Sequence, residues 1–298
     1  MFSATSANSF DKPIEGIHEM KRRFLAMLAV LALALGAGFA AGCGDDDDDG
    51  GDDTGNLGLI KEGQILAGTD TPFPPFEIGQ PPDISGYDID VVNAVAEKLG
   101  LDVTYQDTSF DTIFRDTAQG KFDLAVAAST ITPERENTVD FSDPYYEANQ
   151  GLVVTKDSDI ATVEDLDGKI VGAQDATTGE TYANDETNAA EVRGFPEGPD
   201  AINALRAGQV DAVIIDEPVV VDALESQAGG DIELAATIET GELYGVAFAD
   251  DKDALREAFN GALQELKEDG TIADLYEQYF PGIEAPASVL EGTNDQLK

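Results

Sequence analysis

Three charged side chains occupy positions at which a binding or catalytic group is expected. Asp70 follows the apolar run 65–67 and Asp216 ends the apolar run 212–215, so each lies at the end of an expected strand, while Arg135 closes the segment ITPER. A desolvated carboxylate attracts an ammonium or guanidinium group, and a guanidinium grips a carboxylate with two hydrogen bonds. Taken alone, the aspartates also fit a turn or a helix cap, and the arginine fits a surface ion pair.

The N-terminal region is predicted to be an export signal. Residues 20–23 (MKRR) form a basic start, residues 24–41 are apolar, and small residues precede Cys43. This order is typical of a cleaved signal; a permanent anchor is the alternative, because about 18 apolar residues can span a bilayer. The segment resembles the lipobox of bacterial lipoproteins, which implies lipidation of Cys43. We therefore predict a mis-called extension at residues 1–19 and a lipoprotein signal peptide at residues 20–42.

The composition of the predicted mature chain excludes several functions. Removal of residues 1–42 takes away four basic and three acidic residues and changes the formal net charge from −43 to −44. Such a negative chain is not expected to bind nucleic acid. The only His, His18, is removed as well, and Cys43 is the only Cys. We therefore exclude Ser-His-Asp and Cys-His catalysis and expect no metal and no cofactor, although carboxylate, Lys or Tyr chemistry stays open.

Beyond the signal, residues 43–59 are predicted to be a disordered acidic linker, because the run Asp45–Asp49 has almost nothing apolar beside it. A calcium site is the alternative, although an aspartate run lacks the spacing of a calcium-binding loop.

From residue 64 onward, short apolar runs alternate with helical patterns, which is typical of an α/β fold. Strands are expected at 65–67, 103–105, 122–127, 151–154, 169–173, 212–215 and 243–249. Helices are expected at 88–99, 110–118, 178–183, 199–207, 218–227, 253–267 and 271–279. Thr132 and Pro133 fit the N-cap and first position of a further helix.

Seven segments resemble, in the same order, those of the polar amino-acid solute-binding proteins of ABC importers. They are 68–77 (GTDTPFPPFE), 86–91 (GYDIDV), 110–114 (FDTIF), 122–146, 168–180, 208–218 and 269–280. The resemblance implies a two-lobed α/β fold of the periplasmic-binding-protein type II, with two hinge strands and the ligand in the interlobe cleft. It implies lobe 1 at residues 60–151 and 246–284, lobe 2 at residues 152–245, and a C-terminal tail at residues 285–298.

The same resemblance gives the charged residues roles in binding the α-groups of an amino acid. Arg135 is expected to hold the α-carboxylate, and Thr178 to add donors to that carboxylate from the second lobe. Asp216 is expected to pair with the α-ammonium. Thr130 and the carbonyl of Ala128 are expected to complete these contacts from the first lobe.

Other residues are expected to surround the ligand side chain. Phe73 and Phe110 would flank it as apolar walls, with an ordinary core position as the alternative for either. In the resembling proteins an aspartate at the position of Asp70 meets polar or cationic side chains. Gln174 stands where glutamine-binding relatives commonly carry Lys, so Asp70 has no neutralising cation there, and this favours a basic ligand.

The resemblance implies an extracytoplasmic, lipid-anchored binding component of an ABC importer for a polar or basic L-amino acid of the arginine, lysine, histidine or glutamine type. Its expected partners are the free amino acid and a membrane permease with its ATPase, and a monomer without enzymatic activity is expected. A sensory or surface amino-acid-binding lipoprotein is one alternative. A cyclohexadienyl-type dehydratase on the same fold is another, disfavoured because Asp70 and Asp216 would repel a dicarboxylate substrate.

Overall fold

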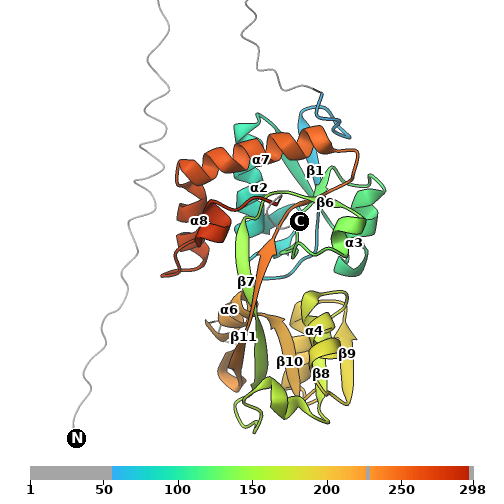
Figure 1. Cartoon of the computed structure of the whole chain (residues 1–298), viewed down its shortest axis with the longest axis vertical. Coiled ribbons are helices and arrows are strands. Elements are labelled where there is room, and N and C mark those ends of the chain that lie inside the picture. Colours follow the sequence, from blue (N-terminus) through green and yellow to red (C-terminus); the bar gives the residue numbers. More distant parts are fainter. Residues whose placement is uncertain (1–55, 226–228, 295–298) are drawn as a thin grey trace, which may run out of the picture. The chain divides into compact units, whose positions relative to one another are not determined.

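The computed structural model of the protein describes residues 56–225 and 229–294. The predicted signal peptide, Cys43 and most of the predicted linker lie outside the described residues. Two five-stranded sheets, each flanked by helices, form two lobes (Figure 1). No helix in the described part of the chain is both long and apolar enough to cross a bilayer.

The first sheet has the strand order β4-β1-β5-β12-β6, with β1 parallel to both of its neighbours. Its strands are β1 (Gln64–Thr69), β4 (Asp102–Asp107), β5 (Leu124–Ala125), β6 (Asp140–Phe141) and β12 (Ala247–Phe248). The helices of this lobe are α2 (Tyr87–Lys98), α3 (Phe110–Ala118), α7 (Asp253–Glu268), α8 (Thr271–Tyr279) and α9 (Ala287–Leu290). A hairpin of β2 (Ile78–Gln80) and β3 (Asp83–Ser85) precedes α2.

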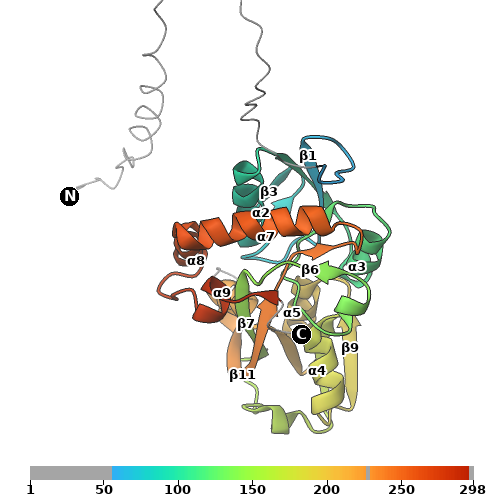
Figure 2. The same cartoon turned by 45° about the horizontal axis from the view of Figure 1, so that its top comes forward.

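The helices of the first lobe form because their apolar residues recur on one face. In α7, Leu255, Phe259, Leu263 and Leu266 are buried and follow the helical period, so they turn the same side toward the core. Figure 2 shows α7 lying beside α2 across the first sheet.

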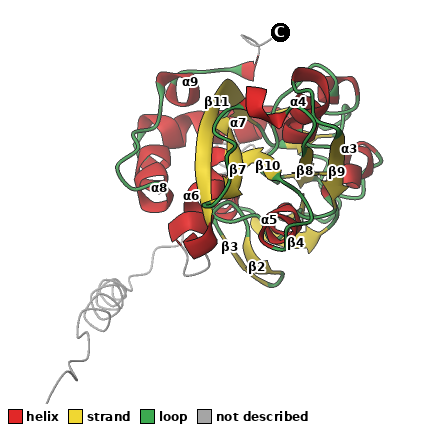
Figure 3. Cartoon of the chain, turned by 90° about the horizontal axis from the view of Figure 1, so that it is seen from below, coloured by secondary structure: helices red, strands yellow, loops and turns green. Residues whose placement is uncertain are grey.

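The second sheet has the order β11-β7-β10-β8-β9. Its strands are β7 (Tyr146–Thr155), β8 (Ile170–Gln174), β9 (Glu191–Phe195), β10 (Ala212–Asp216) and β11 (Ile232–Tyr244). The helices of this lobe are α4 (Thr178–Glu186), α5 (Gly198–Arg206) and α6 (Glu217–Glu225). In Figure 3, α4 and α5 lie on opposite faces of this sheet, so its inner strands β8 and β10 are covered on both sides and are almost entirely apolar.

Two long strands connect the lobes. β7 leaves the first lobe and β11 returns to it, and they pair antiparallel from Tyr146↔Tyr244 to Thr155↔Ile232. The register between them shifts at Ile238–Glu242, in the part of β11 that passes between the lobes (Figure 1). Such an irregularity interrupts the hydrogen bonds between β7 and β11 at this place. A hinge between the lobes requires this local loss of pairing.

The structure differs from the predicted elements at several places. The expected strand 243–249 is two strands, because β11 extends back to Ile232 and ends before β12 begins. The helix expected after Thr132 is wrong: one 3₁₀ turn forms instead (Arg135–Asn137), with the Arg135 N–H donating to Thr132 Oγ1 at 3.2 Å. Two further 3₁₀ turns, Val163–Leu166 and Gly229–Asp231, were not predicted, and neither were α9, β2, β3, β6 and β9.

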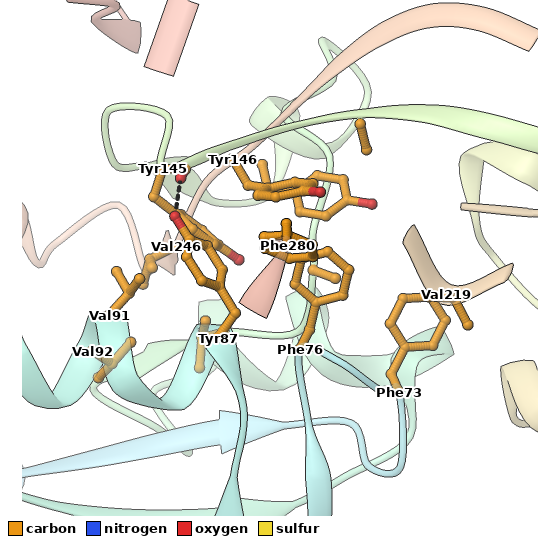
Figure 4. Packing of buried hydrophobic residues seen from close by; sticks show 14 of the residues in the cluster. Phe73, Phe76, Tyr87, Val91, Val92, Tyr145, Tyr146, Val219, Val246 and Phe280 are labelled. Carbon is orange, nitrogen blue, oxygen red and sulfur yellow. Dashed lines mark hydrogen bonds between the residues drawn. The ribbon is translucent and has the colours of Figure 1, made fainter. Parts of the chain in front are cut away.

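An aromatic cluster fills the first lobe where the hinge strands leave it (Figure 4). Phe280 packs against Phe76, Tyr87 and Tyr146 with ring centroids 5.6, 5.3 and 4.6 Å away. The Tyr87 hydroxyl donates to the Tyr145 carbonyl oxygen at 2.8 Å, so a buried polar group is satisfied inside this apolar cluster.

Candidate ligand-binding site

A cavity lies between the two lobes at the carboxyl ends of their strands, where α/β folds usually place their ligands. Every residue that the sequence analysis assigned to the ligand lines it. The lining residues are Asp70, Phe73, Phe110, Ala127, Ala128, Thr130, Arg135, Gln174, Thr177, Thr178 and Asp216. The first seven come from the first lobe and the last four from the second, so the lobes share the cavity.

Arg135 reaches across from the first lobe to the second. Its Nη1 donates to the Thr130 carbonyl oxygen at 2.7 Å and its Nη2 to the Ala176 carbonyl oxygen at 3.2 Å. The guanidinium carbon lies 5.1 and 4.8 Å from the ring centroids of Phe110 and Phe114, which hold it by cation–π contact. Burial lowers the pKa of Arg135 to about 10, so the side chain stays a cation at neutral pH.

Asp216 ends β10 on the second lobe and is held by two donors. Tyr244 Oη donates to its Oδ2 at 2.7 Å, and the Gln150 amide donates to its Oδ1. Burial raises the pKa of Asp216 to about 7, with the nearby Glu242 adding to this effect and the Tyr244, Gln150 and Arg135 contacts opposing it. A cation placed beside this carboxylate would therefore restore its charged form.

Asp70 follows β1 and faces the second lobe from the opposite end of the cavity. Gln174 Nε2 donates to Asp70 Oδ2 at 2.7 Å across the cleft. Asp70 Oδ1 is buried and has no hydrogen-bond partner among the described residues. Burial, and then the charge of Glu197, raise the pKa of Asp70 to about 7, against the opposing Gln174 bond. The arrangement leaves an acceptor oxygen available for a donor.

Two alanines at the site have left-handed backbone conformations: Ala128, which lines the cavity, and Ala176, whose carbonyl oxygen accepts from Arg135. Ala128 has φ 42° and Ala176 has φ 63°, which is uncommon for residues other than glycine and requires support from the surroundings. The Ala128 N–H donates at 2.7 Å to Oδ2 of the fully buried Asp88, which also accepts from Tyr145 Oη at 2.8 Å. Burial, followed by the charge of Asp88, raises the pKa of the neighbouring Glu77 well above its usual range, which favours the protonated form of this carboxyl group.

The second lobe contributes the first turn of α4. The Thr177 side chain accepts from the Glu180 N–H at 3.1 Å and caps the helix, which places Thr178 at its first position. Gly179 follows in close contact, because a Cβ there would lie 2.9 Å from Gln150 Oε1 and 3.1 Å from the Ile214 carbonyl oxygen. This close approach brings the helix N-terminus to the cavity, where its dipole favours an anion.

Residues 65–282 match the model of the bacterial extracellular solute-binding proteins, family 3. The chain belongs to this family.

Several members of family 3 are similar over most of their length. An "ABC transporter arginine-binding protein 1" of Escherichia coli is 33% identical, with 76% of this chain and 94% of the relative covered. An "L-cystine-binding protein TcyA" of Bacillus subtilis is 32% identical over 88% of this chain and 98% of the relative. The solved structure of an ancestral arginine-binding protein bound to arginine is 37% identical, covers 73% of this chain and 98% of its own, and superimposes with a TM-score of 0.69.

The arginine-, lysine-, histidine-binding protein ArtJ from Geobacillus stearothermophilus superimposes with a TM-score of 0.71 at 32% identity, covering 76% of this chain and 99% of its own. These solved neighbours confirm the predicted type II two-lobed fold. A further neighbour, an ancestral amino acid-binding protein described as a precursor of cyclohexadienyl dehydratase, has a TM-score of 0.69 at 33% identity.

One polar residue of this family 3 protein was missed by the sequence analysis. Glu242, on the returning hinge strand β11, accepts hydrogen bonds from Thr130 Oγ1 and Thr178 Oγ1, both at 2.6 Å, and from Gln150 Nε2 at 3.1 Å. It stands directly behind the cavity wall. In the sequence, Glu242 is only an acidic residue two positions before Tyr244. Its contacts cannot be predicted before the path of β11 is known.

Proposed function

We propose that this protein is the extracytoplasmic binding component of an ABC importer for a polar or basic L-amino acid, of the arginine, lysine, histidine or glutamine type. The proposal is carried by one observation: Arg135, Asp216 and Asp70 line a single cavity between the lobes. They supply a cation for an α-carboxylate, an anion for an α-ammonium and a second anion for a side chain. Because both lobes contribute contacts, the ligand stabilises the closed form.

The charges around the cavity support a basic ligand among these candidates. Asp70, Asp216 and Glu242 are acidic and only Arg135 is basic. The α-groups of an amino acid carry no net charge, so a cationic side chain is what reduces the excess of negative charge. Several similar proteins are named for arginine, histidine or lysine, which supports this preference, whereas others are named for cystine.

A thermal-shift screen of the twenty amino acids, ornithine and citrulline tests the proposal. A ligand that binds only the folded protein raises the melting temperature by mass action. We expect L-arginine to give the largest shift, with lysine, histidine, ornithine or glutamine behind it. Shifts confined to acidic or aliphatic amino acids would overturn the role given to Asp70, and no shift at all would overturn the binding function.

We further propose a monomer that is anchored through a lipid on Cys43, does no chemistry, and delivers its ligand to a permease and its ATPase. The proposal is supported by the residues preceding Cys43 and by the relatives named as transporter proteins. Expression of Cys43→Ser in the native cell is expected to move the protein from the membrane fraction to the soluble fraction. Deletion of the gene should abolish uptake of the ligand if the role is transport, and leave uptake unchanged if it is sensing.

A further inference from the structure

The hydroxyl groups of Thr130 and Thr178 are tied to one carboxylate oxygen. Both Oγ1 atoms lie 2.6 Å from Glu242 Oε2, a distance typical of O–H···O⁻ bonds. Thr130 belongs to the first lobe, Thr178 opens α4 of the second, and Glu242 lies on the hinge strand between them. The three residues thus form one polar unit across the cleft.

The direction of these two bonds follows from the chemistry of the groups. A threonine hydroxyl has one hydrogen to donate and two lone pairs, whereas a carboxylate only accepts. Both hydroxyl hydrogens are therefore directed at Glu242, and neither threonine has a side-chain hydrogen left for the cavity. Toward the cavity, Thr130 and Thr178 present only acceptor lone pairs.

Thr178 lies beside Asp216 through a shared donor, and Thr130 is linked to both through Glu242. Gln150 Nε2 contacts Asp216 Oδ1, Glu242 Oε1 at 3.1 Å and Thr178 Oγ1 at 3.4 Å. Asp216 and Thr178 from the second lobe and Thr130 from the first thus supply the cavity with acceptor oxygens only. Such a set matches an ammonium group, which has three hydrogens and no lone pair, and it disfavours a carboxylate or a hydroxyl oxygen there.

We propose that Glu242 is a positioning residue that fixes the hydroxyl hydrogens of Thr130 and Thr178 and so makes their oxygens acceptors for the α-ammonium of the ligand. This inference rests on the proposed amino-acid-binding function. It changes the role expected for Thr178 from its sequence: the hydroxyl serves the ammonium, and the α-carboxylate is left to Arg135 and the backbone N–H groups of the α4 N-terminus.

The variant Glu242→Gln tests this role, because the amide of glutamine can donate to a threonine oxygen and release that hydroxyl hydrogen toward the cavity. The matched control is Glu239→Gln. It makes the same charge change on the same strand, at an exposed side chain that accepts a 3.4 Å hydrogen bond from Asn149 Nδ2.

The measurement is calorimetric affinity for L-arginine and for its 2-hydroxy analogue, in which a hydroxyl replaces the α-ammonium. We expect Glu242→Gln to lower the preference for L-arginine over the analogue at least tenfold and Glu239→Gln to keep it within twofold. Equal losses for both ligands, or an unchanged preference, would overturn the inference.

A second pair of variants covers the case in which Glu242→Gln folds poorly. Thr178→Val removes the acceptor and should lower the preference, while Thr178→Ser keeps the hydroxyl and should retain it; equal preferences in the two would also overturn the inference. Failure of the proposed function itself is distinct, since the wild-type protein would then bind none of the amino acids in the thermal-shift screen.

Discussion

At the scale of single residues, the site is a set of charges whose protonation depends on their partners. Asp70 is buried and Asp216 is half-buried, no cationic side chain of the described residues forms an ion pair with either, and the pKa of each is raised to about 7. Arg135, between the lobes, keeps its charge. The net charge of the ligand-free site is negative. A ligand that carries a cation beside its carboxylate therefore reduces the repulsion between the acidic groups.

Replacement of Asp216 by Asn keeps its shape and removes its charge. We expect affinity for L-arginine to fall by tens-fold to thousands-fold, because leaving one member of a desolvated charge pair without its partner costs about 2–5 kcal/mol. Titration calorimetry measures the change. Asp251→Asn, at an exposed turn of the first lobe, is the control and should bind as the wild type does. Near-native affinity of Asp216→Asn would refute the placement of the ammonium.

The raised pKa values of Asp70 and Asp216 predict that binding depends on pH. Both groups are largely protonated below pH 7 in the absence of ligand, and a cationic ligand requires them ionised. We expect affinity for L-arginine to rise from pH 5 to pH 8 and protons to be released on binding near pH 6, as calorimetry in buffers of different ionisation enthalpy can measure. Asp70→Asn should flatten part of this rise; a pH-independent affinity in the wild type would contradict the prediction.

The same shifts set the sign of a stability effect. Between the ordinary aspartate pKa of 3.8 and about 7, the folded protein binds more protons than the unfolded chain, so these two groups favour the folded state at low pH. Their contribution is lost as the pH rises through 7. Ligand binding reverses this loss, and the melting temperature shift caused by L-arginine should therefore be larger at pH 8 than at pH 5.

At the scale of elements, the cleft is closed by contacts between segments that lie far apart in the sequence. Phe73, in the loop after β1, packs on Gly198 at the start of α5 in the other lobe. A Cβ on Gly198 would lie 2.9 Å from Phe73 Cε2 and 3.0 Å from Ile215 Cδ1, closer than side chains tolerate. This glycine therefore allows the two lobes to meet.

Gly198→Ala is expected to hold the lobes apart and to weaken L-arginine binding by roughly five-fold to a hundred-fold, in line with overpacking costs of about 1–3 kcal/mol. The melting temperature without ligand should change little, because each lobe keeps its own core. Gly261→Ala in α7 is the comparison: a Cβ there meets nothing within 4 Å, so it should raise stability by about 1 kcal/mol and leave affinity unchanged. A Gly198→Ala protein with wild-type affinity would show that this contact does not limit closure.

Some of these elements could be predicted from sequence patterns and others could not, for physical reasons. α7 and α2 were predictable because their apolar residues follow the helical period. The first part of β11 was not, because its side chains are mostly half-buried and follow no clear apolar alternation. The cavity residues were predictable through family motifs, each local in sequence. Glu242 was not, since its importance depends on the hinge strand returning between Thr130 and Thr178, which no local pattern encodes.

At the scale of the whole molecule, the chain carries a formal net charge of −43, with 60 acidic and 17 basic residues. So many like charges repel one another in the folded state more than in the expanded chain. Most of the basic residues in the described part of the chain form ion pairs with nearby carboxylates, such as Lys98 with Asp269 at 3.1 Å. Repulsion among the acidic groups therefore lowers the free energy of unfolding of this protein in dilute salt.

Added salt is expected to act in opposite directions on stability and on binding. Raising NaCl from about 0.02 to about 0.5 M shortens the screening length to a few ångströms. Because the repulsion among acidic groups is then screened, the melting temperature of the ligand-free protein should rise by several degrees. Affinity for L-arginine should fall over the same range, because screening weakens the long-range attraction of a cation. Scanning calorimetry and titration calorimetry measure the two effects, and a lower melting temperature at high salt would contradict the prediction.

The aromatic cluster at the hinge has an optical consequence. The chain has no Trp and eight Tyr, and most of these tyrosines gather in this cluster, with Tyr146 and Tyr244 on the two hinge strands themselves. Tyr244 also donates to Asp216 in the cavity. The near-ultraviolet emission of the unmodified protein therefore comes largely from chromophores at the pivot, one of them bonded to the ligand site. We therefore expect lobe closure to change the intrinsic tyrosine fluorescence, so that its rate can be followed in stopped flow without any attached dye.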